Sequence, residues 1–222
     1  MSMNKPYRDP GDLPGVIPVF PLEAALMLPR GQLPLNIFEP RYLAMIDDAL
    51  RADRIIGMVQ PALTGAPDRG SRPLQPVGCA GRLTQIAETG DGRYVITLSG
   101  VARFRVVEEL TTLTPYRQCR VDFHEFAGDF VPRAGEKEVD RDGLVKALRA
   151  FADSTRLSID WKAIDQAQNE ELVNALAMMS PFGPKEKQAL LEAPTLKARA
   201  EVLIAITEIE LARGGNATST LQ

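Results

Sequence analysis

Two spacings of hydrophobic residues divide the chain into an extended half and a helical half. Between Val16 and His124, short runs of alternating apolar and polar residues are separated by glycine and proline, which is typical of β-strands. From about Asp140 onward, apolar residues recur at the i, i+3, i+4, i+7 spacing of one helix face. The pattern predicts an α+β protein whose mostly β half precedes a helical half.

The extended half reads as short strands with one inserted helix. Its strand segments are VIPVF, LPLNIF, IIGMVQ, VGCAGRLTQIAE, RYVITLSG, VARFRVVEEL and YRQCRVDFHEF. The turn from Glu88 to Arg93 has the Asp-Gly chemistry of a tight hairpin, so we expect its flanking strands to pair antiparallel. Short, twisted strands favour a small curled sheet or barrel, because closure removes exposed strand edges.

The inserted helix follows a strand directly. Apolar residues alternate from Leu33 to Ile37, and a helix is predicted over Pro40 to Asp53. Its apolar face consists of Tyr42, Met45, Ile46 and Ala49. Proline stands in the first turn, where an N–H is spare, and Glu39 lies beside the positive end of the helix dipole. We therefore predict a sharp strand-to-helix corner at Glu39-Pro40-Arg41.

The helical half contains three apolar stripes that we interpret as core-facing. They are Leu144, Ala147, Leu148 and Phe151; Leu172, Ala175, Leu176 and Met179; and Val202, Ala205, Ile206 and Ile209. Pro184 predicts the start of a shorter helix that ends before Pro194, and Asp160 predicts an N-cap.

The change of period predicts the organisation of the chain. Residues 1–126 are expected to form the β-rich domain, 127–139 a linker and hinge, and 140–213 the helical bundle. The tail 214–222 has no apolar anchors and is predicted to be flexible.

Composition is that of a globular protein, with 45% hydrophobic and 25% charged residues. No apolar run approaches the roughly 18 to 20 residues that cross a bilayer, and no apolar segment follows the charges at the start, so we expect a cytoplasmic protein. The formal net charge is -3 at pH 7, which does not favour nucleic acid as a partner.

Arginine supplies 13 of the 14 basic residues up to position 125. Arg82, Arg93, Arg103, Arg105, Arg117 and Arg120 lie in or beside the predicted strands. We expect them to cover the outer face of the sheet and to pair with Glu88, Glu108, Glu109 and Asp122. The alternative is that their planar donors bind carboxylates, phosphates or peptide carbonyls.

Few residues favour catalysis or metal binding. Cys79 and Cys119 have no neighbouring His or Cys and are predicted to be buried small hydrophobes, and His124 is predicted to be structural or exposed. The segment 65–72 is the nearest approach to a phosphate loop, but Ser71 stands where the lysine should be, so we expect a surface loop. The sequence predicts no metal and no cofactor.

A family resemblance is carried by five segments that occur in order. They are IPVFPLEAALMLPRGQLPLNIFEPRYLAMIDDAL, RIIGMVQP, GCAGRLTQI, GRYVITLSGVARFRVVEE and LVNALAMMSPFGPKEKQALLEAPTLKARAEVL. From about Val16 to Leu211 the chain resembles the amino-terminal substrate-binding domain of Lon proteases, and more closely the stand-alone proteins that consist of that domain alone. The resemblance implies a PUA-like β pseudo-barrel with one inserted helix, followed by a C-terminal helical bundle.

The resemblance also implies a function without catalysis. In the full proteases this domain engages unfolded or tagged polypeptide, whereas ATP hydrolysis and the serine-lysine proteolytic site belong to other domains. No catalytic residue is therefore carried over. We expect a non-enzymatic polypeptide-binding module in protein quality control, with a protease or chaperone as a further partner. The sequence does not define the clients or the oligomeric state.

Two roles are expected around the corner. In the family Pro40 would fix the helix start and Glu39 would pair with an arginine across the barrel. We further hypothesise an apolar groove that accepts an extended hydrophobic peptide, edged by Leu33, Pro34, Phe38 and Tyr42.

Two other classes of function compete with this reading. PUA-like folds also bind RNA, and an arginine-bearing sheet could contact phosphates. Against RNA stand the acidic pI near 5.4, the lack of a basic cluster and the 6% of aromatic residues on which bases could stack. The third class is a small enzyme with a site between barrel and bundle, which would need a buried carboxylate or cysteine of shifted pKa in an apolar pocket.

Overall fold

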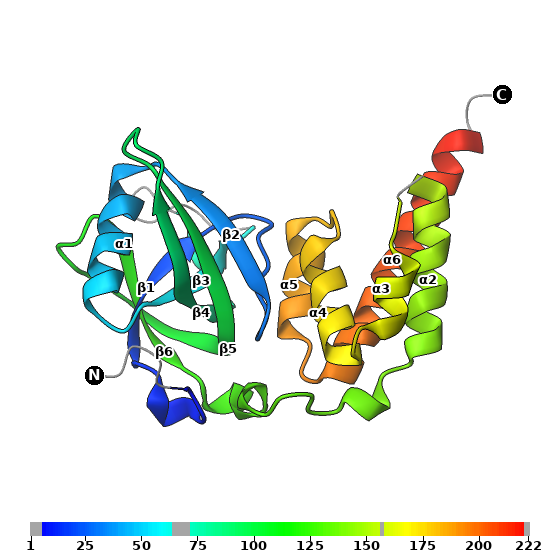
Figure 1. Cartoon of the computed structure of the whole chain (residues 1–222), viewed down its shortest axis with the longest axis horizontal. Helices are drawn as coiled ribbons and strands as arrows, with labels where there is room; N and C mark the ends of the chain where they lie inside the picture. The colour runs from blue at the N-terminus through cyan, green and yellow to red at the C-terminus, as the bar shows by residue number, and fades with distance from the viewer. Residues whose placement is uncertain (1–5, 64–71, 156–157, 220–222) are drawn as a thin grey trace.

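A six-stranded sheet forms the N-terminal half of the computed structural model, which describes residues 6–63, 72–155 and 158–219. The strands are β1 (Val16–Pro21), β2 (Gln32–Ile37), β3 (Ile55–Pro61), β4 (Leu74–Glu88), β5 (Tyr94–Leu110) and β6 (Arg117–Asp122). Their order is β2-β5-β4-β3-β1-β6, with a further pairing of β5 and β6. Because β5 pairs with both β4 and β6, five strands close into a barrel and β2 is added to it (Figure 1). The expected pseudo-barrel is confirmed.

The pairings follow from the connections. Strands β4 and β5 are antiparallel across the hairpin, from Glu88 opposite Tyr94 inward, as the Asp-Gly turn predicts. The two segments expected on either side of Gly100 form one strand, β5. Strands β1 and β3 pair in parallel, and the chain between them includes a helix, as a parallel crossover requires.

That helix, α1 (Pro40–Arg51), confirms the predicted strand-to-helix corner. Pro40 occupies its first turn, and Glu39 is its N-cap residue without a side-chain capping bond. The four buried residues are those of the predicted apolar face, namely Tyr42, Met45, Ile46 and Ala49. The helix ends two residues before the predicted end at Asp53.

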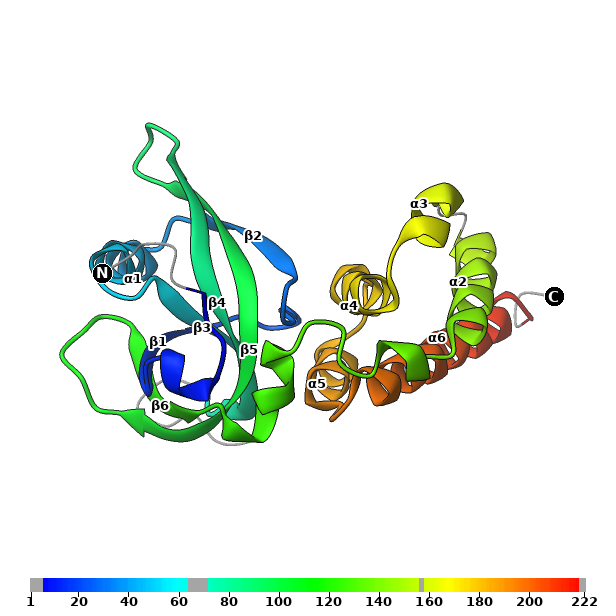
Figure 2. The ribbon, with the colours of Figure 1, turned by 60° about the horizontal axis from the view of Figure 1, so that its bottom comes forward.

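The helical half comprises α2 (Arg141–Thr155), α3 (Trp161–Gln166), α4 (Asn169–Met179), α5 (Pro184–Glu192) and α6 (Leu196–Ser219). Helices α4 and α5 lie next to the barrel, and α2, α3 and α6 lie on their far side (Figures 1 and 2). The Asp160 carboxylate caps α3 through the N–H groups of Lys162 and Ala163, and Pro184 stands in the first turn of α5. Both predicted starts are therefore confirmed.

Two of the three predicted apolar stripes are wrong in register. Helix α4 buries Leu172, Val173, Asn174 and Ala177, whereas Met179 is 82% exposed. Helix α6 buries Ala200, Leu203 and Thr207, whereas Ala205 and Ile209 are exposed. Each of these helices contacts several elements, so the positions of its partners, rather than its apolar stripe alone, select the buried face.

The predicted linker, residues 127–139, contains regular structure and contacts both halves. The 3₁₀ helices here are η2 (His124–Phe130) and η3 (Glu136–Glu138); a third, η1 (Pro10–Asp12), precedes β1. Asp129 of η2 is buried against the barrel, and Glu136 of η3 accepts the N–H of Asn169 at the start of α4. At the other end α6 runs to Ser219, whereas the tail is predicted to begin after Arg213.

One hydrophobic core joins the two halves. Its largest cluster combines barrel and α1 residues such as Leu98 and Ile46 with Val173 of α4 and Leu190 of α5. A second cluster surrounds Phe104. Polar contacts reinforce the junction, because the Gln60 side-chain amide of β3 donates to the Pro184 carbonyl and to the Gln188 Oε1 atom of α5.

Candidate functional site

A cleft of about 570 Å³ lies between β2 of the barrel and α4 of the helical half. Its apolar lining comes from Leu26, Pro29, Leu33, Pro34, Pro132, Ala175, Met178 and Met179. Gly31 allows Met178 to pack directly on the backbone, because a Cβ at Gly31 would collide with the Met178 sulfur. The cleft therefore offers adaptable methionine side chains opposite a strand.

Strand β2 presents a free backbone edge beside this cleft. The Arg30 N–H donates to the Gly100 carbonyl over 2.8 Å, and the Gly100 N–H donates to the Gly31 carbonyl over 2.8 Å. The period of two then turns alternate β2 backbone groups away from β5, namely those of Gln32, Pro34 and Asn36. Within the described part of the chain, β5 is the only strand paired with β2. Pro34 has no N–H, so the free edge offers the N–H groups of Gln32 and Asn36 and the carbonyls of all three residues.

The structure does not bring the four predicted groove residues together. Leu33 and Pro34 line the cleft. Phe38 is 61% exposed but lies outside the cleft lining. Tyr42 is buried, with its ring centroid 4.1 Å from that of Phe20, because it belongs to the core-facing side of α1. The expected groove around Tyr42 is therefore replaced by a cleft whose other wall is α4.

The expected pairing of Glu39 across the barrel is wrong. Its carboxylate lies 2.7 Å from the Arg41 guanidinium, two residues away, and both side chains are about half exposed. The Arg41 guanidinium also lies 4.5 Å from the centroid of the Tyr42 ring. The Glu39 side chain is short and Arg41 is only two residues away, so Glu39 pairs locally. The charges at the corner Glu39-Pro40-Arg41 therefore pair within the corner and not with the barrel.

The α4 wall and the ion pair at the end of the cleft have no counterpart in the local sequence pattern. Arg30 and Arg133 have φ angles of 65° and 61°, in the region that favours glycine, which costs about 1–3 kcal/mol for each residue. Both converge on Glu170 of α4: the Arg30 side chain pairs with its carboxylate, and the Arg133 N–H donates to it over 2.8 Å. The adjacent Met178 and Met179 are the signal for this wall in the sequence, but helical spacing assigns Met179 to a core-facing stripe.

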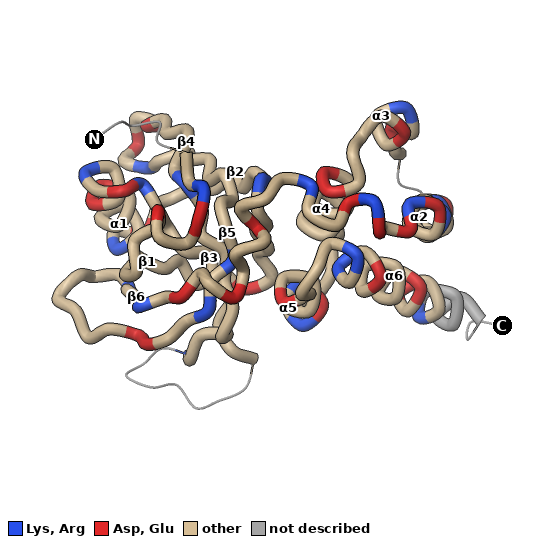
Figure 3. The backbone as a smooth tube through the Cα atoms, turned by 90° about the horizontal axis from the view of Figure 1, so that it is seen from below, with Lys and Arg blue, Asp and Glu red and all other residues tan. Residues whose placement is uncertain are grey.

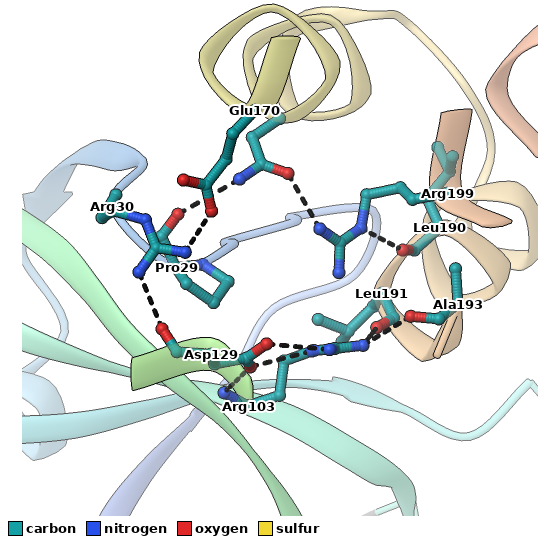
Figure 4. Close-up of polar contacts among 10 residues, drawn as sticks. Pro29, Arg30, Arg103, Asp129, Glu170, Leu190, Leu191, Ala193 and Arg199 are labelled. Atoms are coloured by element: carbon teal, nitrogen blue, oxygen red, sulfur yellow. Dashed lines mark hydrogen bonds and ion pairs between the residues drawn. The ribbon is translucent and has the colours of Figure 1, made fainter. Parts of the chain in front are cut away.

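A second cavity of about 280 Å³ adjoins the cleft and is bordered by three arginines, Arg30, Arg103 and Arg199. Arg103 is buried, and Asp129 holds it through hydrogen bonds of 2.9 Å and 2.8 Å from Nε and Nη2 (Figure 4). The same guanidinium donates to the carbonyls of Leu191 and Ala193 at the end of α5. It therefore satisfies helix-terminal acceptors that have no intrahelical donor.

Arg103 departs from the expected role of the strand arginines. Arg105 pairs with Glu125, Arg117 with Glu109 and Arg120 with Glu108, all near the surface as expected for a sheet exterior. Arg103 points to the same outer face, but η2 and the end of α5 cover that face. Burial of this position was not visible in the alternation of β5.

Thiol and imidazole chemistry is not favoured. Cys79 and Cys119 are buried, as predicted, and burial raises the pKa of both thiols, that of Cys119 to about 11. The His124 side chain is exposed and lies 2.6 Å from the Asp122 carboxylate. No group of three or more metal-ligating side chains occurs among the described residues. The segment 65–71, compared above with a phosphate loop, lies outside the described residues.

Comparisons with known proteins agree with this architecture. The sequence model of the ATP-dependent protease La (LON) substrate-binding domain matches residues 16–208. Lon protease 2 of Myxococcus xanthus is 30% identical over 203 residues, which are 87% of this chain and 23% of that protein. Lon protease of Anaeromyxobacter dehalogenans is 29% identical over 203 residues, with the same coverage. The chain thus spans about a quarter of the length of these relatives.

Solved structures show the same fold. A Lon N-terminal domain protein from Xanthomonas campestris has a TM-score of 0.59 and 23% identity, and the match covers 86% of this chain and 97% of that one. The N-terminal domain of the Mycobacterium avium complex Lon protease has a TM-score of 0.61 and 18% identity, over 87% and 98% of the two chains. No helix in the described ranges combines the length and hydropathy needed to cross a membrane. With the family model covering most of its length, the chain belongs to the Lon substrate-binding domain family.

Proposed function

We propose that this chain is a non-enzymatic module that binds unfolded or extended polypeptide in the cleft between β2 and α4. The observation that carries the proposal is the free edge of β2 beside an apolar cleft lined by Leu33, Pro34, Met178 and Met179. An extended peptide can satisfy backbone donors and acceptors of the edge while its side chains enter the cleft. In a folded protein most backbone groups are already paired, so fewer are available to this edge.

The proposed cellular role is client recognition in protein quality control in the cytoplasm, with a protease or chaperone as partner. The family supports this role, because its name describes substrate binding in an ATP-dependent protease. The buried thiols with raised pKa support binding rather than covalent catalysis, because the thiolate is the reactive form. The Phe38 side chain, exposed beyond the end of β2, is available to a longer peptide.

The charge distribution favours polypeptide over RNA. Lys, Arg, Asp and Glu alternate along the backbone of both halves rather than separating into a basic face (Figure 3). Most strand arginines are paired with carboxylates, including Arg105, Arg117 and Arg120. Phosphate binding would have to break such pairs.

Fluorescence anisotropy with a labelled, permanently unfolded polypeptide tests the proposal. We expect saturable binding that unlabelled unfolded chain displaces and that folded protein and RNA do not. The affinity should change little with salt, because counterion release accompanies phosphate contacts but not apolar burial. Displacement by RNA alone, or absence of binding, would refute the proposal.

A matched pair of variants locates the site. Met179→Asp places a charge in the cleft, and we expect at least roughly tenfold weaker binding, since one buried apolar side chain contributes about 1.5–3 kcal/mol. Leu113→Asp makes the same kind of change at a fully exposed position of the β5–β6 connection and should bind as the wild type does. If both variants bind with equal affinity, the polypeptide does not bind in the cleft between β2 and α4.

A further inference from the structure

The cavity beside the cleft contains a buried cation without an anionic partner. Arg199 of α6 is 4% exposed. Its Nε donates to the Leu190 carbonyl over 3.0 Å, and its Nη1 donates to the Asn174 Oδ1 atom over 2.9 Å (Figure 4). Among the described residues, no carboxylate lies within 4.0 Å of this guanidinium, and its Nη2 has no hydrogen-bond acceptor. In Figure 4, Nη2 points into the space bordered by Arg30 and Arg103.

The other two arginines at this cavity are paired with carboxylates. The buried Arg103 pairs with Asp129, and the exposed Arg30 pairs with Glu170. At the exposed rim, Lys197 lies 3.9 Å from Glu201 and Glu125 is held by Arg105, so both have partners outside the cavity lining, and Glu138 is exposed to solvent. Among the described residues, Arg199 is the buried guanidinium at this cavity that has no carboxylate partner.

Helix dipoles do not supply the missing anion. The last turn of α5 directs carbonyls at Arg103 and Arg199, which contributes about half a negative charge. The first turn of α6 borders the same cavity through Leu196 and Lys197 and contributes about half a positive charge. The two ends offset each other, and in the first turn of α6 the Thr195 hydroxyl oxygen accepts the N–H of Ala198 over 3.1 Å.

A buried guanidinium in this situation favours an added anion. Burial, followed by the charge of Arg103, lowers the pKa of Arg199 to about 10, so the group stays charged at neutral pH but is destabilised in that form. Asp129 and Glu170 beside the cavity favour a monoanion over a phosphate dianion, because their carboxylates would repel the second negative charge. The planar donors of arginine bind a carboxylate well.

The cavity shares a wall with the polypeptide cleft. Pro29, Arg30, Glu170 and Asn174 border both spaces, and the Arg30–Glu170 ion pair and the hydrogen bond from the Asn174 amide to the Pro29 carbonyl join the two sides of that wall. The end of a chain that occupies the cleft therefore lies next to Arg199 and reaches it where the Arg30–Glu170 pair opens. We propose that the cavity at Arg199 binds a carboxylate, and that in clients this is the free C-terminal carboxylate. The second part rests on the proposed polypeptide-binding function.

Two peptides of one extended apolar sequence, one with a free C-terminal acid and one with a C-terminal amide, test this directly on the full chain. We expect the acid to bind roughly tenfold to a hundredfold more tightly, as for a buried charge-assisted hydrogen bond. Equal affinities of acid and amide would overturn the assignment of the chain end.

Variants of Arg199 connect this preference to the cavity. Arg199→Gln should bind the acid no better than the amide, whereas Arg213→Gln, at an exposed position of the same helix, should keep the full preference. If Arg199→Gln folds poorly, Arg199→Lys is the second variant. It keeps the positive charge but lacks the planar pair of guanidinium donors, so it should prefer the acid over the amide less strongly than the wild type does. A full preference in a folded Arg199→Gln variant would contradict the proposal.

Small anions separate this proposal from the proposed function. N-acetylglycine should raise the thermal unfolding midpoint of the wild type more than sodium chloride of equal ionic strength does, and should not do so in Arg199→Gln. Such a shift without binding of either peptide would refute polypeptide binding but support a carboxylate site for free small molecules. A shift with inorganic phosphate alone, or with neither anion, would overturn the carboxylate site.

Discussion

Removing Asp129 should destabilise this protein far more than removing a surface carboxylate of similar geometry. Asp129 accepts three hydrogen bonds from Arg103. The Arg103 backbone N–H and the side-chain Nε donate over 2.9 Å each, and the side-chain Nη2 donates over 2.8 Å. The two side chains are only 5% and 10% exposed. Asp129→Ala leaves a buried guanidinium without its anion.

The expected loss in the free energy of unfolding is about 3–5 kcal/mol, the range for breaking a buried ion pair from one side. The lower end applies here, because Arg103 keeps its bonds to the Leu191 and Ala193 carbonyls and its position 4.6 Å from the centroid of the Phe126 ring. Glu125→Ala is the control. Glu125 accepts two bonds from Arg105 at 2.6 Å and 2.7 Å, but those side chains are nearly half exposed, so the loss should be about 0–1 kcal/mol.

Urea unfolding followed by both circular dichroism and Trp161 fluorescence measures the two losses. Equal slopes for wild type and variants, and coincident curves from the two probes, support comparison of free energies. If Asp129→Ala costs no more than Glu125→Ala, burial of the pair does not control its contribution to stability. The lack of a carboxylate at the buried Arg199 would then be no reason to expect an anion there.

Three further predictions concern single contacts. Burial lowers the pKa of Lys187 to about 8, so the unfolded chain binds the proton more tightly. The stability of wild type relative to Lys187→Met should therefore rise by about 1.5 kcal/mol from pH 8 to pH 9.5. Urea midpoints of both proteins at each pH check this rise, and parallel profiles would contradict it. Gly100→Ala should lower the free energy of unfolding by about 2 kcal/mol or more, because the new Cβ collides with the Leu28 carbonyl oxygen. Gly15→Ala adds a Cβ in open space and should leave stability unchanged, and thermal unfolding compares the two variants. Tyr116→Phe should lose about 1.5 kcal/mol because the hydroxyl donates to the Asp48 carboxylate over 2.7 Å, and an unchanged urea midpoint would count against that bond.

Local patterns predicted the elements where a single physical signal dominates. The α1 corner is one case, since Pro40 fixes the helix start and all four apolar-face residues are buried. The hairpin of β4 and β5 is another, because its turn residues select the connection. Local signals failed where two surfaces compete for one element, as on α4, whose apolar stripe indicated Met179 as core although that side chain is exposed at the cleft.

The candidate site shows the same division. Alternation in β2 indicated Leu33 and Pro34, but the opposite wall comes from α4, more than 130 residues later in the chain. Arg103 has the sequence environment of the other strand arginines, and only the covering by η2 and α5 makes it a buried anchor. Likewise, the lack of an anion at Arg199 is a property of the folded chain.

The sequence by itself determined the class of fold, the division into β and helical halves, and the strand-to-helix corner, because these depend on periodicity and on proline chemistry within a few residues. Only the tertiary structure decided which helix faces are buried, where the cleft lies and which arginines lose their contact with water. Those outcomes depend on how the helical half docks on the barrel, and docking is fixed by side chains far apart in the chain, such as Gln60 with Gln188 and Arg30 with Glu170.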